Sequence, residues 1–117
     1  MYVYKAVVKR WVDGDTVDVD IDLGFSVILR DQRVRLFGVD APETRTRDLD
    51  EKERGLATKE YCIKMAPEGS AVVLRSYKDA RGKFGRILAE ILVMDGPIER
   101  NLNALLVEEG YAERYLL

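Results

Sequence analysis

Apolar and polar residues alternate along the first third of the chain, which is typical of β-strands buried on one face. Residues Tyr2 to Val12 are apolar with interspersed basic residues and predict a first strand. From Thr16 the alternation is strict, with Val17, Val19, Ile21 and Leu23 on one face and Asp18, Asp20 and Asp22 on the other. A third β-rich run covers residues 27–39 and ends before Pro42, which cannot continue a central ladder. The pattern therefore predicts three consecutive strands.

The remainder of the chain mixes helical and strand patterns. Residues 43–54 form a charged segment predicted as a loop, and apolar residues at roughly helical spacing predict a helix from Gly55 to Ala66. Two further strands are expected at residues 71–77 and 86–94, followed by a helix over residues 102–109 that Gly110 caps. This order predicts an α+β fold with a small, strongly curled sheet or barrel, forming a single domain over residues 1–117.

Composition is that of a soluble globular domain, with 47% hydrophobic and 34% charged residues among 117. No apolar run approaches the ~18 residues that a membrane span needs. The start, MYVYKAVVKR, lacks the features of a signal peptide. We therefore expect a cytoplasmic protein with no membrane partner, although a leader that had been removed would leave the same start.

Two scarcities limit the chemistry. The chain has no histidine, which excludes Ser-His-Asp and Cys-His nucleophile chemistry and His-ligated metals. Its single cysteine, Cys62, excludes an intramolecular disulfide and a multi-cysteine zinc site. Any bound metal should therefore be a hard cation that takes oxygen ligands.

Charge is unevenly distributed along the chain. Residues 13–22 contain five aspartates and no cation, whereas residues 71–86 contain five basic residues and one acidic residue, Asp79. An acidic cluster and a basic cluster together suit a cation and a polyanion. A solvated mixed surface is the alternative that this pattern leaves open.

The aspartate-rich stretch does not form a helix-loop-helix calcium motif. That motif needs glycine at loop position 6 and glutamate at position 12. A loop starting at Asp18 places Leu23 and Leu29 there, and a loop starting at Asp13 places Val17 at position 5, where an acid is needed. We therefore expect Asp18, Asp20 and Asp22 to face solvent on a strand. Asp13 and Asp15 flank Gly14, and a plain hairpin turn would account for them.

Three motifs in order carry a resemblance to a known family. They are Asp13-Gly14-Asp15-Thr16-Val17, then Arg35-Leu36-Phe37-Gly38-Val39-Asp40-Ala41-Pro42-Glu43-Thr44, then Lys83-Phe84-Gly85-Arg86-Ile87-Leu88-Ala89. The chain resembles the staphylococcal nuclease (thermonuclease) family over essentially its whole length, and residues 103–110 are similar to the second helix of that family. The resemblance implies a five-stranded OB-fold β-barrel with two helices. The family's further C-terminal helix has no counterpart within the 117 residues.

The resemblance also implies roles for individual residues. Asp15 and Asp40 would ligate Ca²⁺ together with the backbone carbonyl of Ala41, and Asp13 would lie behind them. Arg35 and Arg86 would clamp the scissile phosphate, and Glu43 would activate or only position the attacking water. The implied reaction is calcium-dependent, sequence-nonspecific hydrolysis of single-stranded DNA, double-stranded DNA and RNA, leaving 3'-phosphates. In the cytoplasm, Mg²⁺ or Mn²⁺ are alternatives to Ca²⁺.

The sequence departs from the family pattern at substrate-binding positions. Phe84 stands where a family tyrosine hydrogen-bonds phosphate, and Lys83 precedes it. A second family tyrosine has no direct match, and Tyr115 is the nearest candidate. Ala41 replaces a threonine, which leaves the ligating carbonyl in place.

Two other functions are weighed against a nuclease that works as a monomer. One is a catalytically weak or inactive OB-fold module that binds nucleic acid or a peptide, and the other is a purely structural domain. A module without chemistry has no need of Asp15, Arg35, Asp40, Glu43 and Arg86 together. Their joint presence favours the enzyme.

Overall fold

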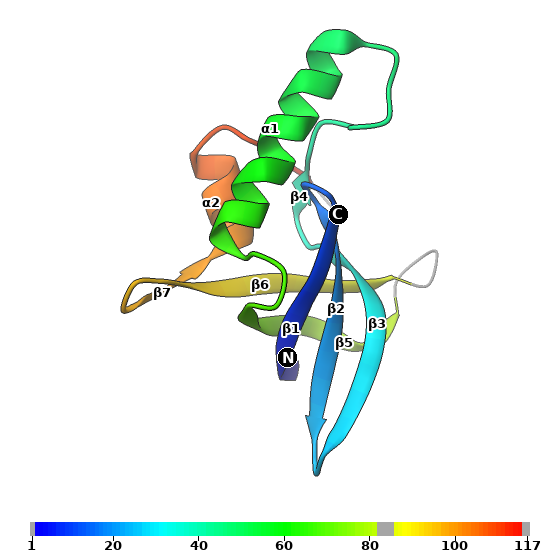
Figure 1. Cartoon of the computed structure of the whole chain (residues 1–117), viewed down its shortest axis with the longest axis vertical. Helices are drawn as coiled ribbons and strands as arrows, with labels where there is room; N and C mark the ends of the chain where they lie inside the picture. The colour runs from blue at the N-terminus through cyan, green and yellow to red at the C-terminus, as the bar shows by residue number, and fades with distance from the viewer. Residues whose placement is uncertain (1, 82–85, 116–117) are drawn as a thin grey trace.

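The computed structural model of the chain describes the backbone of residues 2–81 and 86–115, and the side chains of these residues except 77–81. Its main feature is a curled six-stranded sheet with the strand order β3-β2-β1-β5-β6-β7 (Figure 1). The strands are β1 (Tyr2–Asp13), β2 (Thr16–Gly24), β3 (Val27–Leu36), β5 (Ala71–Arg81), β6 (Ile87–Asp95) and β7 (Ile98–Asn101). Two helices, α1 (Leu49–Met65) and α2 (Leu102–Glu108), and a short sheet of β4 (Val39–Asp40) and β8 (Glu113–Arg114) complete the fold.

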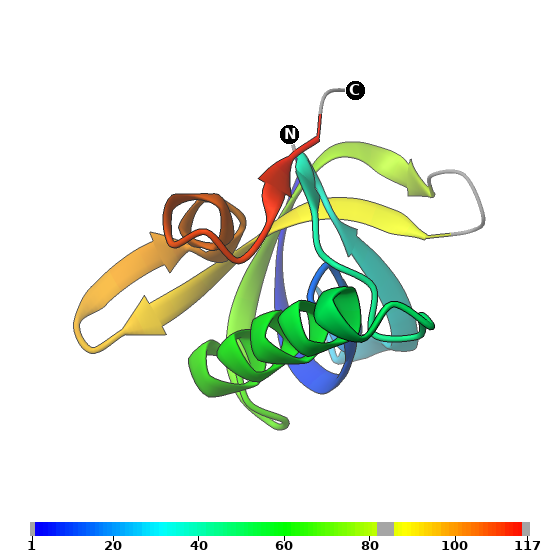
Figure 2. The same ribbon diagram turned by 90° about the horizontal axis from the view of Figure 1, so that it is seen from above.

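The sheet curls because β3 also pairs with β6. This parallel contact is short and joins Val34 to Ile87, Arg35 to Leu88 and Leu36 to Ala89. It brings β1, β2, β3, β5 and β6 into a ring, and β6 continues beyond the ring into β7 (Figure 2). The predicted α+β fold with an OB-like barrel and two helices is confirmed.

The core lies inside the curl, where alternate residues of the strands meet. Val17, Val19 and Ile21 of β2 are buried, as their alternation predicts. The indole N–H of Trp11 donates to the Ala66 carbonyl at 2.9 Å, which attaches the end of α1 to β1. None of the described helices is long and apolar enough to cross a membrane.

The structure differs from the prediction at several elements, including β5, which continues to Arg81 rather than ending at Tyr77. Helix α1 begins at Leu49 rather than Gly55, because the Asp48 side chain accepts from the N–H groups of Asp50 and Glu51 and so caps an earlier turn. The third strand ends at Leu36, where Gly38 takes a positive φ of 78° and reverses the chain before β4. The short strands β7 and β8 were not expected, since they lack enough residues to show a period.

Helix α1 packs directly on the segments that carry the first two family-like motifs. A Cβ on Gly14 would lie 2.3 Å from Cγ2 of Thr58, and a Cβ on Gly55 would lie 2.5 Å from the Glu43 carbonyl oxygen. The buried Cys62 thiol also donates to the Gly14 carbonyl at 3.5 Å. Both glycines are therefore required by space, and they let α1 approach the Asp13–Asp15 turn and the Pro42–Glu43 loop closely.

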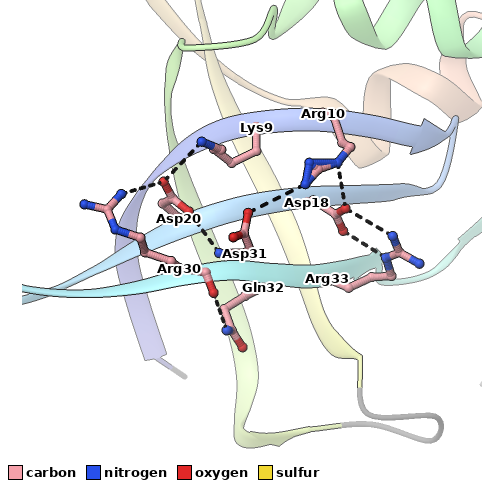
Figure 3. A network of polar contacts seen from close by, with 8 residues as sticks. All are labelled: Lys9, Arg10, Asp18, Asp20, Arg30, Asp31, Gln32 and Arg33. Carbon is pink, nitrogen blue, oxygen red and sulfur yellow. Dashed lines mark hydrogen bonds and ion pairs between the residues drawn. The ribbon is translucent and has the colours of Figure 1, made fainter.

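The prediction for the aspartates of β2 was wrong for two of the three. Asp22 is exposed, as expected, but Asp18 is buried and Asp20 is half-buried. Asp18 lies between Arg10 of β1 and Arg33 of β3, which are its partners in the two ladders (Figure 3). Alternation correctly assigned the face of β2, but it could not indicate that basic side chains from both neighbouring strands cover that face.

Candidate functional site

Asp15 lies at the turn between β1 and β2 and is held from several directions. Its Oδ2 accepts the Ala41 N–H at 2.9 Å, and its Oδ1 accepts the Thr16 hydroxyl at 3.1 Å. Its carbonyl accepts the Leu36 N–H at 2.9 Å. These contacts fix a buried carboxylate where the turn between β1 and β2 meets the distant segment from the end of β3 to Ala41.

Arg35 joins Asp15 to Asp40. Its Nη2 lies 3.6 Å from Asp15 Oδ2 and 3.5 Å from Asp40 Oδ1. Its Nη1 donates to the carbonyls of Leu36 and Val39, at 3.0 and 2.7 Å. The guanidinium is thus anchored by the turn between β3 and β4, and the two predicted metal-ligating carboxylates converge on it.

The oxygen atoms of Asp15 and Asp40 suit a hard divalent cation that takes only a few of its ligands from the protein. The carboxylates of Asp15 and Asp40 come from separate segments and converge on Arg35. The N–H of Ala41 donates a hydrogen bond to Asp15. Among residues whose side chains are described, 2–76 and 86–115, no group of three or more His, Cys, Asp or Glu side chains could hold a metal ion. A cation held by Asp15, Asp40 and one carbonyl would therefore take its remaining ligands from water, which Ca²⁺ accepts readily. The same carboxylates attract Arg35, so a bound cation would compete with the guanidinium for them.

Asp13 and Glu43 both meet the loop that follows β4. Asp13 Oδ1 accepts a hydrogen bond from the Thr44 hydroxyl, which joins the first turn to the loop after β4. Glu43 is exposed, and its N–H donates to Glu51 Oε2 of α1 at 3.2 Å. In the part of the chain that the structure describes, no ion pair joins Glu43 to Arg35. Glu43 is therefore close in sequence to Asp40 but open to solvent.

Arg86 lies just before β6 and lines an open pocket of ≈ 450 Å³ together with Val12, Asp13, Thr16 and Arg33. The pocket contains two of the predicted site residues, Asp13 and Arg86. It is next to the Asp15–Arg35 junction, since Thr16 follows Asp15 and pairs with Arg35 in the ladder. Lys83 and Phe84 lie outside the described residues.

Tyr115 does not line the pocket that contains Arg86. Its N–H donates to the Gly38 carbonyl at 2.9 Å, and it lines a separate pocket of ≈ 400 Å³ beside α2 and the 37–39 turn. The pocket and Arg35 both contact this turn, since Val39 lines the pocket and its carbonyl accepts a hydrogen bond from Arg35. The contact between Tyr115 and substrate stays a prediction.

Sequence reasoning missed Arg33 and Gly55. Arg33 is two residues before Arg35 on the same face of β3, and that spacing was a usable signal. Gly55 was predicted as the first residue of the helix. The structure places it inside α1, where a glycine costs about 1 kcal/mol relative to alanine. What could not be read was the identity of the neighbour, because Glu43 meets Gly55 only in the folded chain.

Comparisons with known proteins identify the family to which the chain is related. A family model described as "Staphylococcal nuclease homologue" matches residues 33–116. Endonuclease YhcR of Bacillus subtilis (strain 168) is 30% identical over 119 residues, covering 97% of this chain and 9% of that protein. Thermonuclease of Staphylococcus intermedius is 34% identical, covering 91% of this chain and 56% of that protein. Protein ParB of Escherichia coli is 33% identical, covering 95% of this chain and 57% of that protein.

The chain thus spans only part of the length of these relatives, from 9% to 57%. The family model matches well over half of the chain, including the segment that carries Arg35, Asp40 and Arg86. The chain belongs to the staphylococcal nuclease family.

Proposed function

We propose that the protein is a nuclease that hydrolyses phosphodiester bonds of single-stranded DNA, double-stranded DNA and RNA without sequence preference, as a Ca²⁺-dependent monomer that leaves 3'-phosphates. The observation that carries this proposal is the convergence of Asp15 and Asp40 on Arg35, beside a pocket lined by Arg86. Relatives named as an endonuclease and a thermonuclease support it.

The metal would be held by Asp15, Asp40 and the Ala41 carbonyl. When bound, Ca²⁺ would supply Lewis acidity and a template for phosphate and water. Asp15 is suited to this role because Thr16 and Ala41 orient its carboxylate before any ligand arrives. Preorganisation of this kind removes the cost of ordering the side chain on binding.

Arg35 and Arg86 are the groups that bind the phosphate in this proposal. A phosphodiester gains negative charge in its five-coordinate transition state, and a guanidinium that stays charged and offers paired donors stabilises that charge. The Leu36 and Val39 carbonyls hold Arg35 in one orientation, so its charge is fixed next to the carboxylates.

Glu43 is the proposed partner of the attacking water. Its carboxylate is exposed and belongs to the loop that follows Asp40, and the chain has no histidine to act as a base. It accepts a proton from water in one version of the mechanism and only orients water in the other.

The test is cleavage of a labelled single strand with Ca²⁺, with EDTA, and with Mg²⁺ or Mn²⁺ in place of Ca²⁺. We expect cleavage with Ca²⁺, none with EDTA, 3'-phosphate ends on the products, and a loss of about two orders of magnitude or more in Arg86→Ala. Asp22→Asn is the matched control, because Asp22 is exposed and far along β2 from Asp15. Cleavage that persists in EDTA, or an Arg86→Ala variant with unchanged rate, contradicts the mechanism. Salt-sensitive binding without any cleavage would favour the binding module.

A further inference from the structure

A second arginine lines the pocket beside Arg86. Arg33 belongs to β3, and the parallel pairing of Val34 with Ile87 places Arg33 and Arg86 at adjoining positions of neighbouring strands. Asp13 is the acidic side chain among the five residues that line this pocket. The lining itself carries two guanidiniums and one carboxylate, and a second carboxylate, Asp18, pairs with Arg33 from outside the lining. The side that faces the pocket is therefore positive, which favours an anionic ligand.

Asp18 holds Arg33 in a fixed orientation. Arg33 Nε donates to Asp18 Oδ1 at 2.8 Å and Arg33 Nη2 donates to Asp18 Oδ2 at 3.1 Å. This hydrogen-bond pair, and then the charge of Asp18, raise the pKa of Arg33 above its ordinary value. Asp18 is buried and is itself held by Arg10 Nε at 3.3 Å, so the carboxylate is a firm support (Figure 3).

The pairing with Asp18 leaves part of the Arg33 guanidinium available. A guanidinium has five N–H donors, and the fork to Asp18 uses one on Nε and one on Nη2. Three donors remain, and half of the side chain is exposed to solvent. An oriented, half-exposed guanidinium with spare donors matches the geometry of a phosphate group.

We propose that Arg33, positioned by Asp18, binds a phosphate of the nucleic-acid strand next to the one at Arg35 and Arg86. This inference rests on the proposed function, because it adds a second phosphate contact to the same substrate path. It assigns Arg33 to binding of longer strands and gives it no part in bond cleavage.

The test is binding of a labelled single strand of about twelve nucleotides in EDTA, where cleavage is not expected, between about 50 and 200 mM salt. For Arg33→Gln we expect the slope of log K against log salt to fall in magnitude by about 0.7, and affinity at 0.1 M salt to fall roughly fivefold. Arg30→Gln is the matched control: it removes the same charge from the same strand, but Arg30 pairs with Asp20 and does not line the pocket. Equal weakening in both variants would overturn the inference.

Cleavage kinetics provide a second measurement. In Ca²⁺, Arg33→Gln should raise KM for the long strand with little change in kcat, and should leave cleavage of a dinucleotide unchanged because it has no second phosphate. If wild-type protein neither binds nor cleaves the strand, the proposed function fails as well. If it does both and Arg33→Gln behaves like wild type, only the Arg33 contact is wrong.

Arg33→Lys keeps the inference testable if Arg33→Gln does not fold. Lysine retains the charge, but it cannot make two hydrogen bonds to Asp18 and contact a phosphate at the same time. We expect a slope equal to that of the wild type and weaker binding of the long strand. Affinity equal to that of the wild type would overturn the positioning role of Asp18.

Discussion

At one end of the β2–β3 pair, Thr16 pairs with Arg35 beside the packed Asp13–Asp15 turn; at the other end, Gly24 pairs with Val27 beside a fully exposed Phe25. We call these the site end and the tip. The tip points away from α1 along the long axis of the molecule (Figure 1). The strands β2 and β3 thus connect a tightly packed region, the site end, to a region that makes almost no packing contacts, the tip.

The two ends constrain the chain through different physics. At the site end, Gly14 is required because α1 leaves no room for a Cβ, although its φ is not positive. At the tip, Gly24, Phe25 and Ser26 all have positive φ, of 82°, 54° and 65°, with open space around Gly24. At the site end, the space beside α1 limits which residue is tolerated. At the tip, the positive φ angles of the turn impose the limit.

The largest expected effect tests this contrast with one substitution at each end. Gly14→Ala should destabilise the protein by about 3 kcal/mol, because the new methyl group overlaps buried Thr58. Gly24→Ala should cost only about 1 kcal/mol, because the strain is confined to one φ angle. Urea unfolding of both variants measures the difference, and similar losses at the two ends would contradict it.

The second expected effect is a sensitivity to alkaline pH at the site end. Burial, and then the negative charge of Asp15, raise the pKa of the Cys62 thiol from 9.0 to about 12. The unfolded thiol ionises near pH 9 while the folded thiol keeps its proton, so stability is complete below pH 9 and falls as pH rises towards 12. At pH 10.5 we expect a loss of roughly 2 kcal/mol from this group.

Cys62→Ser is the matched control, since its hydroxyl does not ionise in this range. The unfolding free energies of the wild type and of Cys62→Ser should diverge by roughly 2 kcal/mol between pH 8 and pH 10.5. Parallel curves would show that the thiol does not carry the effect.

The smallest expected effect is at the tip. Phe25→Asn combined with Ser26→Gly replaces two residues that tolerate positive φ poorly with the pair preferred in such turns. We expect a gain of about 1 kcal/mol in the free energy of unfolding and unchanged cleavage of a single strand. A loss of stability would mean that the Phe25 side chain makes a contact that outweighs its backbone strain.

The same contrast explains how far the sequence predicts the molecule. Alternation in β2 correctly predicted that Val17, Val19 and Ile21 are buried, because that pattern depends on one strand alone. It misjudged Asp18, because burial of that carboxylate depends on Arg10 and Arg33 from other strands.

The candidate site follows the same rule. The family motifs named Asp15, Arg35 and Asp40 in advance, and the fold brings these three together. The anchoring of Arg35 by the Leu36 and Val39 carbonyls could not be predicted, because it depends on the reversal of the chain at Gly38. The long aspartate run contributes one carboxylate to this junction, and the other comes from the end of β4.

The most direct test of the central claim is calorimetric titration of Ca²⁺ into wild type, Asp40→Asn and Asp22→Asn. Asp40 is 58% exposed, so its substitution should leave the fold intact. We predict one site in wild type and in Asp22→Asn, and affinity weakened at least about tenfold in Asp40→Asn because one of two carboxylate ligands has lost its charge. Unchanged binding in Asp40→Asn, or binding lost in Asp22→Asn, would mean that the aspartate run holds the ion and that the junction at Arg35 does not.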